Sequence, residues 1–113
     1  MEFLVRSTTT FPSGMSAERI AELRSAERAL AMKLRADGIL RRLWRIPGRQ
    51  GTVGLYRTRD ATHLHEVLTS LPLFPCMSIE VEALATHPQE AQESAAGADV
   101  TAAAPANGAS GPA

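Results

Sequence analysis

A carboxylate lies in the middle of an apolar stripe in the first third of the chain. Between positions 16 and 38, large apolar residues recur at the three- and four-residue spacing of one helix face: Ile20, Leu23, Leu30 and Leu34. Glu27 occupies the central position of that face, where a carboxylate is costly unless it is paired, hydrogen-bonded or protonated. The spacing leaves two interpretations open. Glu27 is either a glutamate at the rim of the core, paired with Arg24 and Arg28, or a general base that faces a pocket.

Arginine supplies eleven of the twelve basic residues. Its planar guanidinium suits carboxylate and phosphate groups, so a small anionic ligand is expected. Six arginines lie on two consecutive predicted strands and the turns beside them: Arg41, Arg42, Arg45, Arg49, Arg57 and Arg59. Strand alternation places Arg41 on one face and Arg42 on the other, beside Trp44. These arginines either protect a solvated strand edge, or one or two of them enter the space between sheet and first helix and bind an anion beside Glu27.

The histidines and the cysteine do not form a recognisable reactive set. His63 and His65 are two positions apart on a predicted helix and do not share a face, and no further ligands follow at a metal-binding spacing. No metal site is therefore predicted, and His65 is either a structural histidine or a proton shuttle. The single cysteine, Cys76, excludes an intramolecular disulfide. We interpret it as a buried thiol in a protein of a reducing compartment.

Composition limits the class of protein. A chain of 113 residues has room for one domain. Up to position 88 it carries twelve basic and nine acidic residues, and this net charge of +3 is too small to indicate nucleic-acid binding. The N-terminus lacks a signal-peptide pattern, and no apolar run approaches the roughly 20 residues of a membrane span, so we expect a cytoplasmic protein. Residues 89–113 are rich in alanine, glycine and proline and are predicted to be a disordered tail.

The elements that must position these residues follow the order βαββαβ. Alternating or β-branched runs predict strands at 2–10, 40–46, 52–57 and 77–83, and helical spacing predicts helices at 16–38 and from Asp60 to Pro72. This order predicts an α+β ferredoxin-like sandwich, a four-stranded antiparallel sheet with two helices on one face. Leu43, Tyr56 and Leu84 are expected on the bare face, where two chains would cover each other's sheets.

Several short motifs occur in a characteristic order along residues 1–88. They are MEFLVR at 1–6, AERALA at 26–31, LWRIPG at 43–48, LHE at 64–66, LPLFPCM at 71–77, IEV at 79–81 and HP at 87–88. In this order they resemble the muconolactone Δ-isomerase family. The LPLFP run ahead of IEV is the most specific of these motifs.

The resemblance implies a fold, an activity and an assembly. Members of this family have a ferredoxin-like fold, form sheet-to-sheet dimers and larger rings, commonly decamers, and need no cofactor. They move the ring double bond of muconolactone in the β-ketoadipate pathway of aromatic degradation. Glu27 matches the glutamate that we assign as the catalytic base. The substrate-binding residues expected from the resemblance and the arginine series are Arg41, Arg42, Trp44 and His65.

The chain departs from the family pattern at several positions. Leu40 stands in place of a tryptophan, Arg42 of a histidine and Thr52 of an asparagine, while Gln50 and Cys76 each stand in place of a tyrosine. These changes remove aromatic walls and hydrogen-bond donors, so the substrate could be a related small lactone carboxylate. They also leave open a non-catalytic protein that binds small acids or serves assembly on the same scaffold, and a cofactor-independent monooxygenase as a further alternative. Neither nucleic acid nor membrane is an expected partner.

Overall fold

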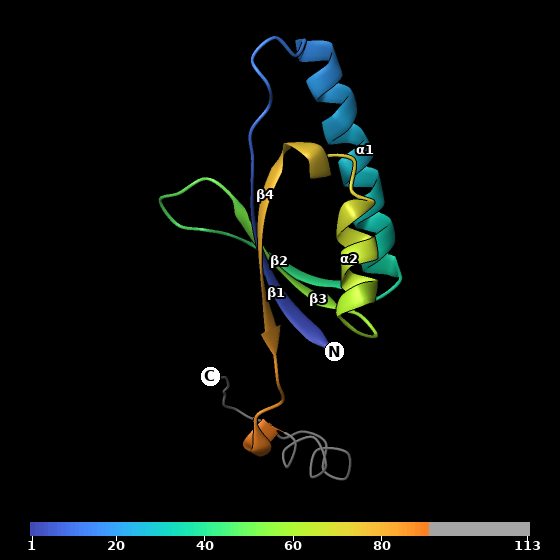
Figure 1. Cartoon of the computed structure of the whole chain (residues 1–113), viewed down its shortest axis with the longest axis vertical. Coiled ribbons are helices and arrows are strands. Elements are labelled where there is room, and N and C mark those ends of the chain that lie inside the picture. The colour runs from blue at the N-terminus through green and yellow to red at the C-terminus, as the bar shows by residue number, and fades with distance from the viewer. Residues whose placement is uncertain (91–113) are drawn as a thin grey trace.

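The computed structural model describes residues 1–90 as a four-stranded antiparallel sheet with both helices on one face (Figure 1). The elements are β1 (Glu2–Thr9), α1 (Ala17–Ala36), β2 (Leu40–Arg45), β3 (Thr52–Arg57), α2 (Ala61–Thr69), the 3₁₀ helix η1 (Phe74–Cys76) and β4 (Met77–Leu84). The strand order is β2-β3-β1-β4. The predicted ferredoxin-like α+β fold is confirmed. The predicted tail, 89–113, lies outside the described residues except for its first two positions.

Both helices begin after a polar residue whose side chain caps the first turn. The Ser16 side chain accepts a hydrogen bond of 3.0 Å from the Arg19 backbone N–H, and Asp60 Oδ1 accepts one of 2.8 Å from the His63 N–H. These bonds satisfy donors that the first helical turn leaves free. Helix α1 ends before Gly38, whose φ of +77° favours glycine. None of the helices in the described part of the chain has the length and apolar character that a membrane crossing requires.

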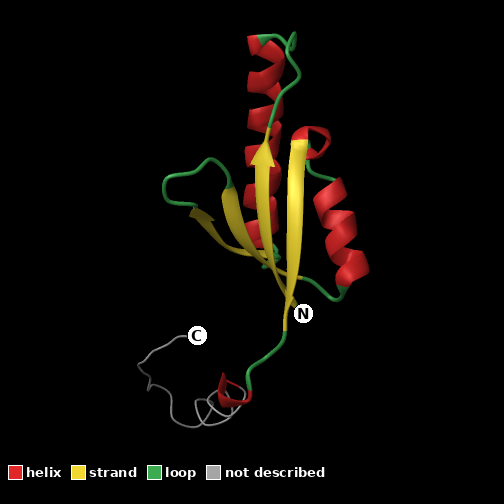
Figure 2. Ribbon diagram, turned by 60° about the vertical axis from the view of Figure 1, so that its left-hand side comes forward, coloured by secondary structure: helices red, strands yellow, loops and turns green. Residues whose placement is uncertain are grey.

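The core fills the space between α2, the C-terminal half of α1 and one end of the sheet. Its buried members are Phe3, Val5, Leu34, Leu40, Tyr56, Leu64, Val67, Leu68 and Leu71. The N-terminal half of α1 extends past the end of the sheet (Figure 2). The apolar stripe of this helix is therefore buried only near its C-terminal end, at Leu34, while Ile20 and Leu23 stay half-exposed.

The strand register decides which side chains face the helices. Phe3 pairs with Tyr56 across β1 and β3, and directly opposed residues share a face, so Tyr56 lies in the core with 8% of its surface exposed. A bulge between Leu40 and Arg42 shifts β2 by one residue and pairs Leu43 with Gly54, which also faces the helices. The prediction that Leu43 and Tyr56 lie on the open face is therefore wrong. Leu84 lies on the open face, as predicted.

Candidate active site

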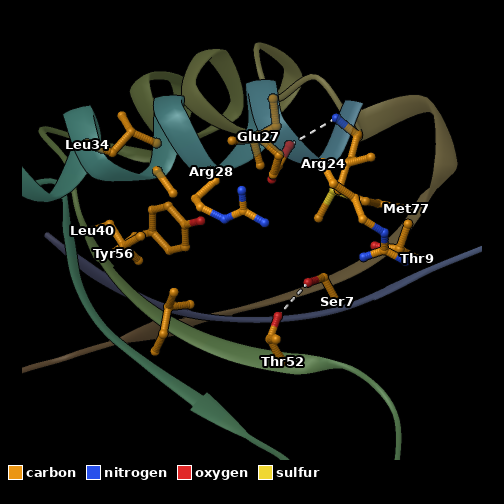
Figure 3. A pocket seen from close by; sticks show the side chains of 14 residues that line it. Ser7, Thr9, Arg24, Glu27, Arg28, Leu34, Leu40, Thr52, Tyr56 and Met77 are labelled. Atoms are coloured by element: carbon orange, nitrogen blue, oxygen red, sulfur yellow. Dashed lines mark hydrogen bonds between the residues drawn. The ribbon is translucent and has the colours of Figure 1, made fainter. Parts of the chain in front are cut away.

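A cavity of about 300 Å³ lies between α1, the sheet and the segment that leads into β4 (Figure 3). Its helix wall is formed by residues spaced along one face of α1: Arg24, Glu27, Arg28, Ala31 and Leu34. Apolar side chains from Leu71, Leu73 and Met77 close one side. The cavity thus combines apolar walls with a few polar groups, which is the usual construction of a small-molecule site.

Glu27 points from α1 into this cavity (Figure 3). Its Oε1 accepts a hydrogen bond of 3.0 Å from the backbone N–H of Leu73, and it forms none of the ion pairs found in residues 1–90. Partial burial raises the pKa of Glu27 above its ordinary value of 4.5, and the Leu73 hydrogen bond offsets part of this shift. A salt bridge to Arg24 or Arg28, one of the two interpretations that the sequence left open, is therefore absent from residues 1–90, and the carboxylate stays available to a ligand.

Two arginines flank Glu27 on the same helix. Arg24 and Arg28 both line the cavity, and Figure 3 shows their side chains reaching into it on either side of Glu27. The Arg24 guanidinium lies 5.0 Å from the ring centroid of Phe11, in the loop before α1, a cation–π contact that favours one orientation of this side chain. Two cations beside one carboxylate leave a positive site that suits a small anion.

Hydroxyl groups line the sheet side of the cavity. Ser7 Oγ and Thr52 Oγ1 lie 3.1 Å apart in a hydrogen bond between β1 and β3, and the side chain of Thr9 lies nearby on the same face (Figure 3). Tyr56 supplies a further hydroxyl. Burial, together with the negative charge of Glu27, raises the pKa of Tyr56 to about 12, so this phenol stays protonated at neutral pH.

The strand arginines expected beside Glu27 do not line this cavity. Arg41 is exposed at the bulge of β2. Arg42 stacks on Trp44 at 5.2 Å from the ring centroid, and both side chains lie on the open face of the sheet because they pair with Leu55 and Val53. Arg41 and Arg42 therefore do not enter the space between sheet and helix, which was one of the two interpretations that the sequence left open. Cations from α1 occupy that space instead.

His65 also lies outside the cavity. It is exposed on α2, because the neighbouring positions Leu64, Val67 and Leu68 are the ones that face the core. Of the positions that depart from the family pattern, Leu40 and Thr52 line the cavity, whereas Arg42, Gln50 and Cys76 do not. Within residues 1–90, no three His, Cys, Asp or Glu side chains are grouped so that they could hold a metal ion.

Several groups at the site were not predicted from the sequence, among them Ser7, Tyr56 and the backbone N–H of Leu73. The position of Ser7 could have been predicted from the sequence. It follows Phe3 and Val5 at the strand period of two, so its hydroxyl lies on the inward face of the strand. The position of Tyr56 was harder to predict, because the face on which it lies depends on the strand register that pairs it with Phe3. The role of the Leu73 N–H could not have been predicted, because residue type does not show which backbone N–H will donate to a side chain.

The fold and this cavity define an α+β sandwich whose helix presents, between two guanidinium groups, a carboxylate without an ion-pair partner in residues 1–90, a class of site suited to proton transfer on an anionic substrate. A family model described as muconolactone delta-isomerase matches residues 1–90. The chain belongs to the muconolactone Δ-isomerase family.

Individual relatives agree with this assignment. The chain is 47% identical over 87 residues to muconolactone Δ-isomerase 2 of Acinetobacter lwoffii, a match covering 77% of this chain and 91% of that protein. It is 38% identical over 88 residues to muconolactone Δ-isomerase of Pseudomonas aeruginosa, covering 78% and 92%. A crystal structure of muconolactone isomerase superposes with a TM-score of 0.73 at 38% identity, covering 78% of this chain and 92% of that one.

A more distant structure shares the fold alone. The 5-chloro-2-hydroxyhydroquinone dehydrochlorinase of Burkholderia phenoliruptrix superposes with a TM-score of 0.58, covering 79% of this chain and 98% of that one. Its sequence identity of 14% is too low to carry an activity across.

Proposed function

We propose that this protein is a cofactor-independent isomerase that moves the ring double bond of muconolactone by proton transfer. The observation that carries the proposal is Glu27, a half-buried carboxylate without an ion-pair partner in residues 1–90, which faces a cavity beside two arginines. Burial brings the pKa of Glu27 upward, toward the range in which a carboxylate works best as a general base. Membership of the muconolactone Δ-isomerase family supports muconolactone as the substrate.

In the proposed reaction, Glu27 moves one proton between two ring carbons. The carboxylate removes a proton from the ring carbon γ to the lactone carbonyl, and the electron pair shifts through the ring double bond onto the carbonyl oxygen, which forms a dienolate. The protonated Glu27 then returns the proton to the carbon α to the carbonyl. The double bond has moved by one position, and neither an oxidant nor a reductant is needed.

The substrate's carboxylate group is bound by Arg24 and Arg28 in this proposal. Both guanidinium groups reach into the cavity from the helix that carries Glu27 (Figure 3). They take the role expected from the sequence for Arg41, Arg42, Trp44 and His65, which lie outside the cavity. A bound carboxylate beside two cations is held by charge-assisted hydrogen bonds, and these are stronger than neutral ones.

The substitution Glu27→Gln tests the proposal. Glutamine keeps an oxygen that accepts from the Leu73 N–H but cannot take up a proton, so the cavity keeps its shape and loses its base. An ultraviolet assay that follows enol-lactone formation from muconolactone should show a loss of about 10²- to 10⁴-fold in kcat. The matched control is Glu22→Gln, an exposed glutamate of the same helix that pairs with Arg19. Turnover of Glu27→Gln within about tenfold of wild type would refute the base assignment.

We propose further that two copies of the chain pair through the open faces of their sheets. Apolar side chains without cover lie on this face: Leu4, Val53 and Leu55 are half-exposed, and Trp44 and Leu84 are 41% and 36% exposed. An apolar patch that spans the strands of a sheet favours self-association, because the same patch on a second copy buries it.

Light scattering coupled to gel filtration tests this assembly. Leu55→Asp places a charge in the middle of the open face and should reduce the measured mass to that of one chain. Thr62→Asp is the matched control, since Thr62 is exposed in the first turn of α2, where an acidic residue is tolerated. A Leu55→Asp protein with the wild-type mass would show that the open face is not the interface.

A further inference from the structure

The hydroxyl of Tyr56 is an unused hydrogen-bond donor inside the cavity. Tyr56 lines the cavity, and Figure 3 shows its hydroxyl pointing away from the sheet toward the side chains of α1. Among residues 1–90, no fully buried side-chain oxygen lacks a partner, and the hydrogen bonds found there include none to Tyr56. The phenol oxygen is therefore not sealed in the core but open to the cavity, where a ligand can reach it.

The backbone around Tyr56 gives its ring a defined place. Gly54 is two residues away on the same face, and a Cβ added there would lie 2.9 Å from Tyr56 Cε1 and 3.3 Å from Leu43 Cδ2. A side chain at Gly54 would collide with the ring, so the glycine leaves the room that the ring occupies. On the other side the ring packs into the buried cluster that contains Phe3 and Leu40. A hydroxyl held by such packing is preorganised, since it loses little freedom when a ligand binds.

In the proposed reaction, the lactone carbonyl oxygen of the substrate has no assigned hydrogen-bond donor. The two arginines bind the substrate's carboxylate and Glu27 takes the proton, while negative charge develops on the lactone carbonyl oxygen. That oxygen needs a donor placed where the charge appears. Tyr56 lies on the sheet, across the cavity from the helix that carries Glu27 (Figure 3). A lactone ring bound between the two residues presents its reacting carbons to Glu27 and its carbonyl oxygen to Tyr56.

We propose that the Tyr56 hydroxyl donates a hydrogen bond to the lactone carbonyl oxygen and stabilises the dienolate. This inference rests on the proposed function. Tyr56 acts as a donor that keeps its proton throughout, because burial and the charge of Glu27 hold its pKa at about 12. When Glu27 takes the substrate's proton, the negative charge leaves the carboxylate and passes to the oxygen that Tyr56 contacts.

Other polar groups of the cavity fit this role less well. Ser7 and Thr52 already share a hydrogen bond of 3.1 Å, so one of their two hydroxyl protons is committed. Arg24 and Arg28 are exposed on their helix and are matched to a full carboxylate charge. Tyr56 is the only tyrosine of the chain, so the single substitution Tyr56→Phe removes its hydroxyl while the ring keeps its packing.

The first measurement compares kinetics and stability. Tyr56→Phe should lower kcat for muconolactone on the order of 10²-fold, with KM changed less than threefold and the melting temperature close to that of wild type. Thr8→Val is the matched control, because it removes an exposed hydroxyl from the opposite face of the sheet and should leave kcat unchanged. A Tyr56→Phe enzyme with wild-type kcat would overturn the inference, while the response to Glu27→Gln separately decides the proposed function.

The second measurement does not depend on turnover. The infrared stretch of the lactone carbonyl is recorded for muconolactone bound to Glu27→Gln and to the double variant Glu27→Gln with Tyr56→Phe. A donor to the carbonyl should place the stretch at a lower wavenumber in the single variant than in the double one. Equal wavenumbers would overturn the inference even if kcat had fallen, and failure of both variants to bind muconolactone would overturn the inference together with the proposed substrate.

Discussion

Strand β1 presents two kinds of side chain to the helices, apolar ones at one end of the sheet and hydroxyl-bearing ones at the other. At one end, Phe3 and Val5 of β1 are buried under α2 and the last turns of α1. At the other end, Ser7 and Thr9 occupy the next two inward positions and border the cavity. One strand thus changes from core to site within a few residues, and its register does not change.

Helix α1 shows the same division along its length. Leu34 near its C-terminus is buried in the core, whereas Glu27 and the two arginines, about two to three turns earlier, face the cavity. Where sheet and helix both carry apolar side chains they pack together, and where both carry polar ones a space remains. The site is therefore the unpacked continuation of the core, which predicts that substitutions at the two ends have separate effects.

The largest expected effect concerns the packed end. Phe3→Ala removes an aromatic side chain that is only 2% exposed and should lower the free energy of unfolding by about 3–5 kcal/mol. Ser7→Ala, four positions later on the same face, loses a single hydrogen bond to Thr52 and should cost about 1 kcal/mol. Urea denaturation of both variants checks this difference. Equal losses would show that the hydroxyl end is as important for packing as the core.

A middle-sized effect concerns the cations of the cavity. Arg28→Met keeps most of the side chain's length but loses the charge, and should raise KM for muconolactone by about 10- to 100-fold, because a charge-assisted hydrogen bond is worth roughly 1.5–3 kcal/mol. Stability should stay within about 0.5 kcal/mol of wild type, as for other exposed positions. Arg35→Met, on the exposed part of the same helix, is the control. Steady-state kinetics would disprove the assignment if both variants had the wild-type KM.

The smallest expected effect is the pH dependence of stability at Glu27. Burial raises the pKa of Glu27 in the folded protein, so the folded state binds its proton more tightly than the unfolded chain. The contribution of Glu27 therefore favours folding at low pH and is lost as the pH rises through the folded pKa. The groups that face it are Arg24, Arg28, Tyr56 and the Leu73 N–H.

Glu27→Gln lacks this penalty and should gain stability relative to wild type as the pH rises from 4 to 8. Denaturant unfolding at both pH values measures the change. The kcat/KM of the wild type should rise with pH through the same raised pKa, because the base must be ionised. A Glu27→Gln protein that lost stability relative to wild type between pH 4 and pH 8 would contradict the assignment of a raised pKa.

The fold was predictable because its signals are local. The caps at Ser16 and Asp60, the helical spacing of α1 and the turn residues between β2 and β3 each specify one element within a few residues. The order of these elements then permits few arrangements. Glu27 was identified as a candidate site residue in the same way, because a carboxylate in the middle of an apolar helix face is visible in the local sequence.

The rest of the site depends on relations that no local pattern contains. A bulge at Arg41 shifts the alternation of β2, so the arginines expected in the cavity lie outside it and Leu43 lies within. The face of Tyr56 follows from its pairing with Phe3, 53 positions away in the sequence. An error of one residue in the register moves every side chain of a strand to the opposite face. For this reason the fold was predicted better than the residues that line its cavity.

The hydrogen bond from the Leu73 N–H to Glu27 also makes this amide a spectroscopic reporter. The donor belongs to a segment 46 residues further along the chain, and the bond is stronger when the carboxylate is ionised than when it is protonated. The amide proton of Leu73 should therefore change its nuclear magnetic resonance frequency as Glu27 gains or loses its proton. A single backbone resonance, distant in sequence, would then follow the charge of the proposed base without any label on the base itself.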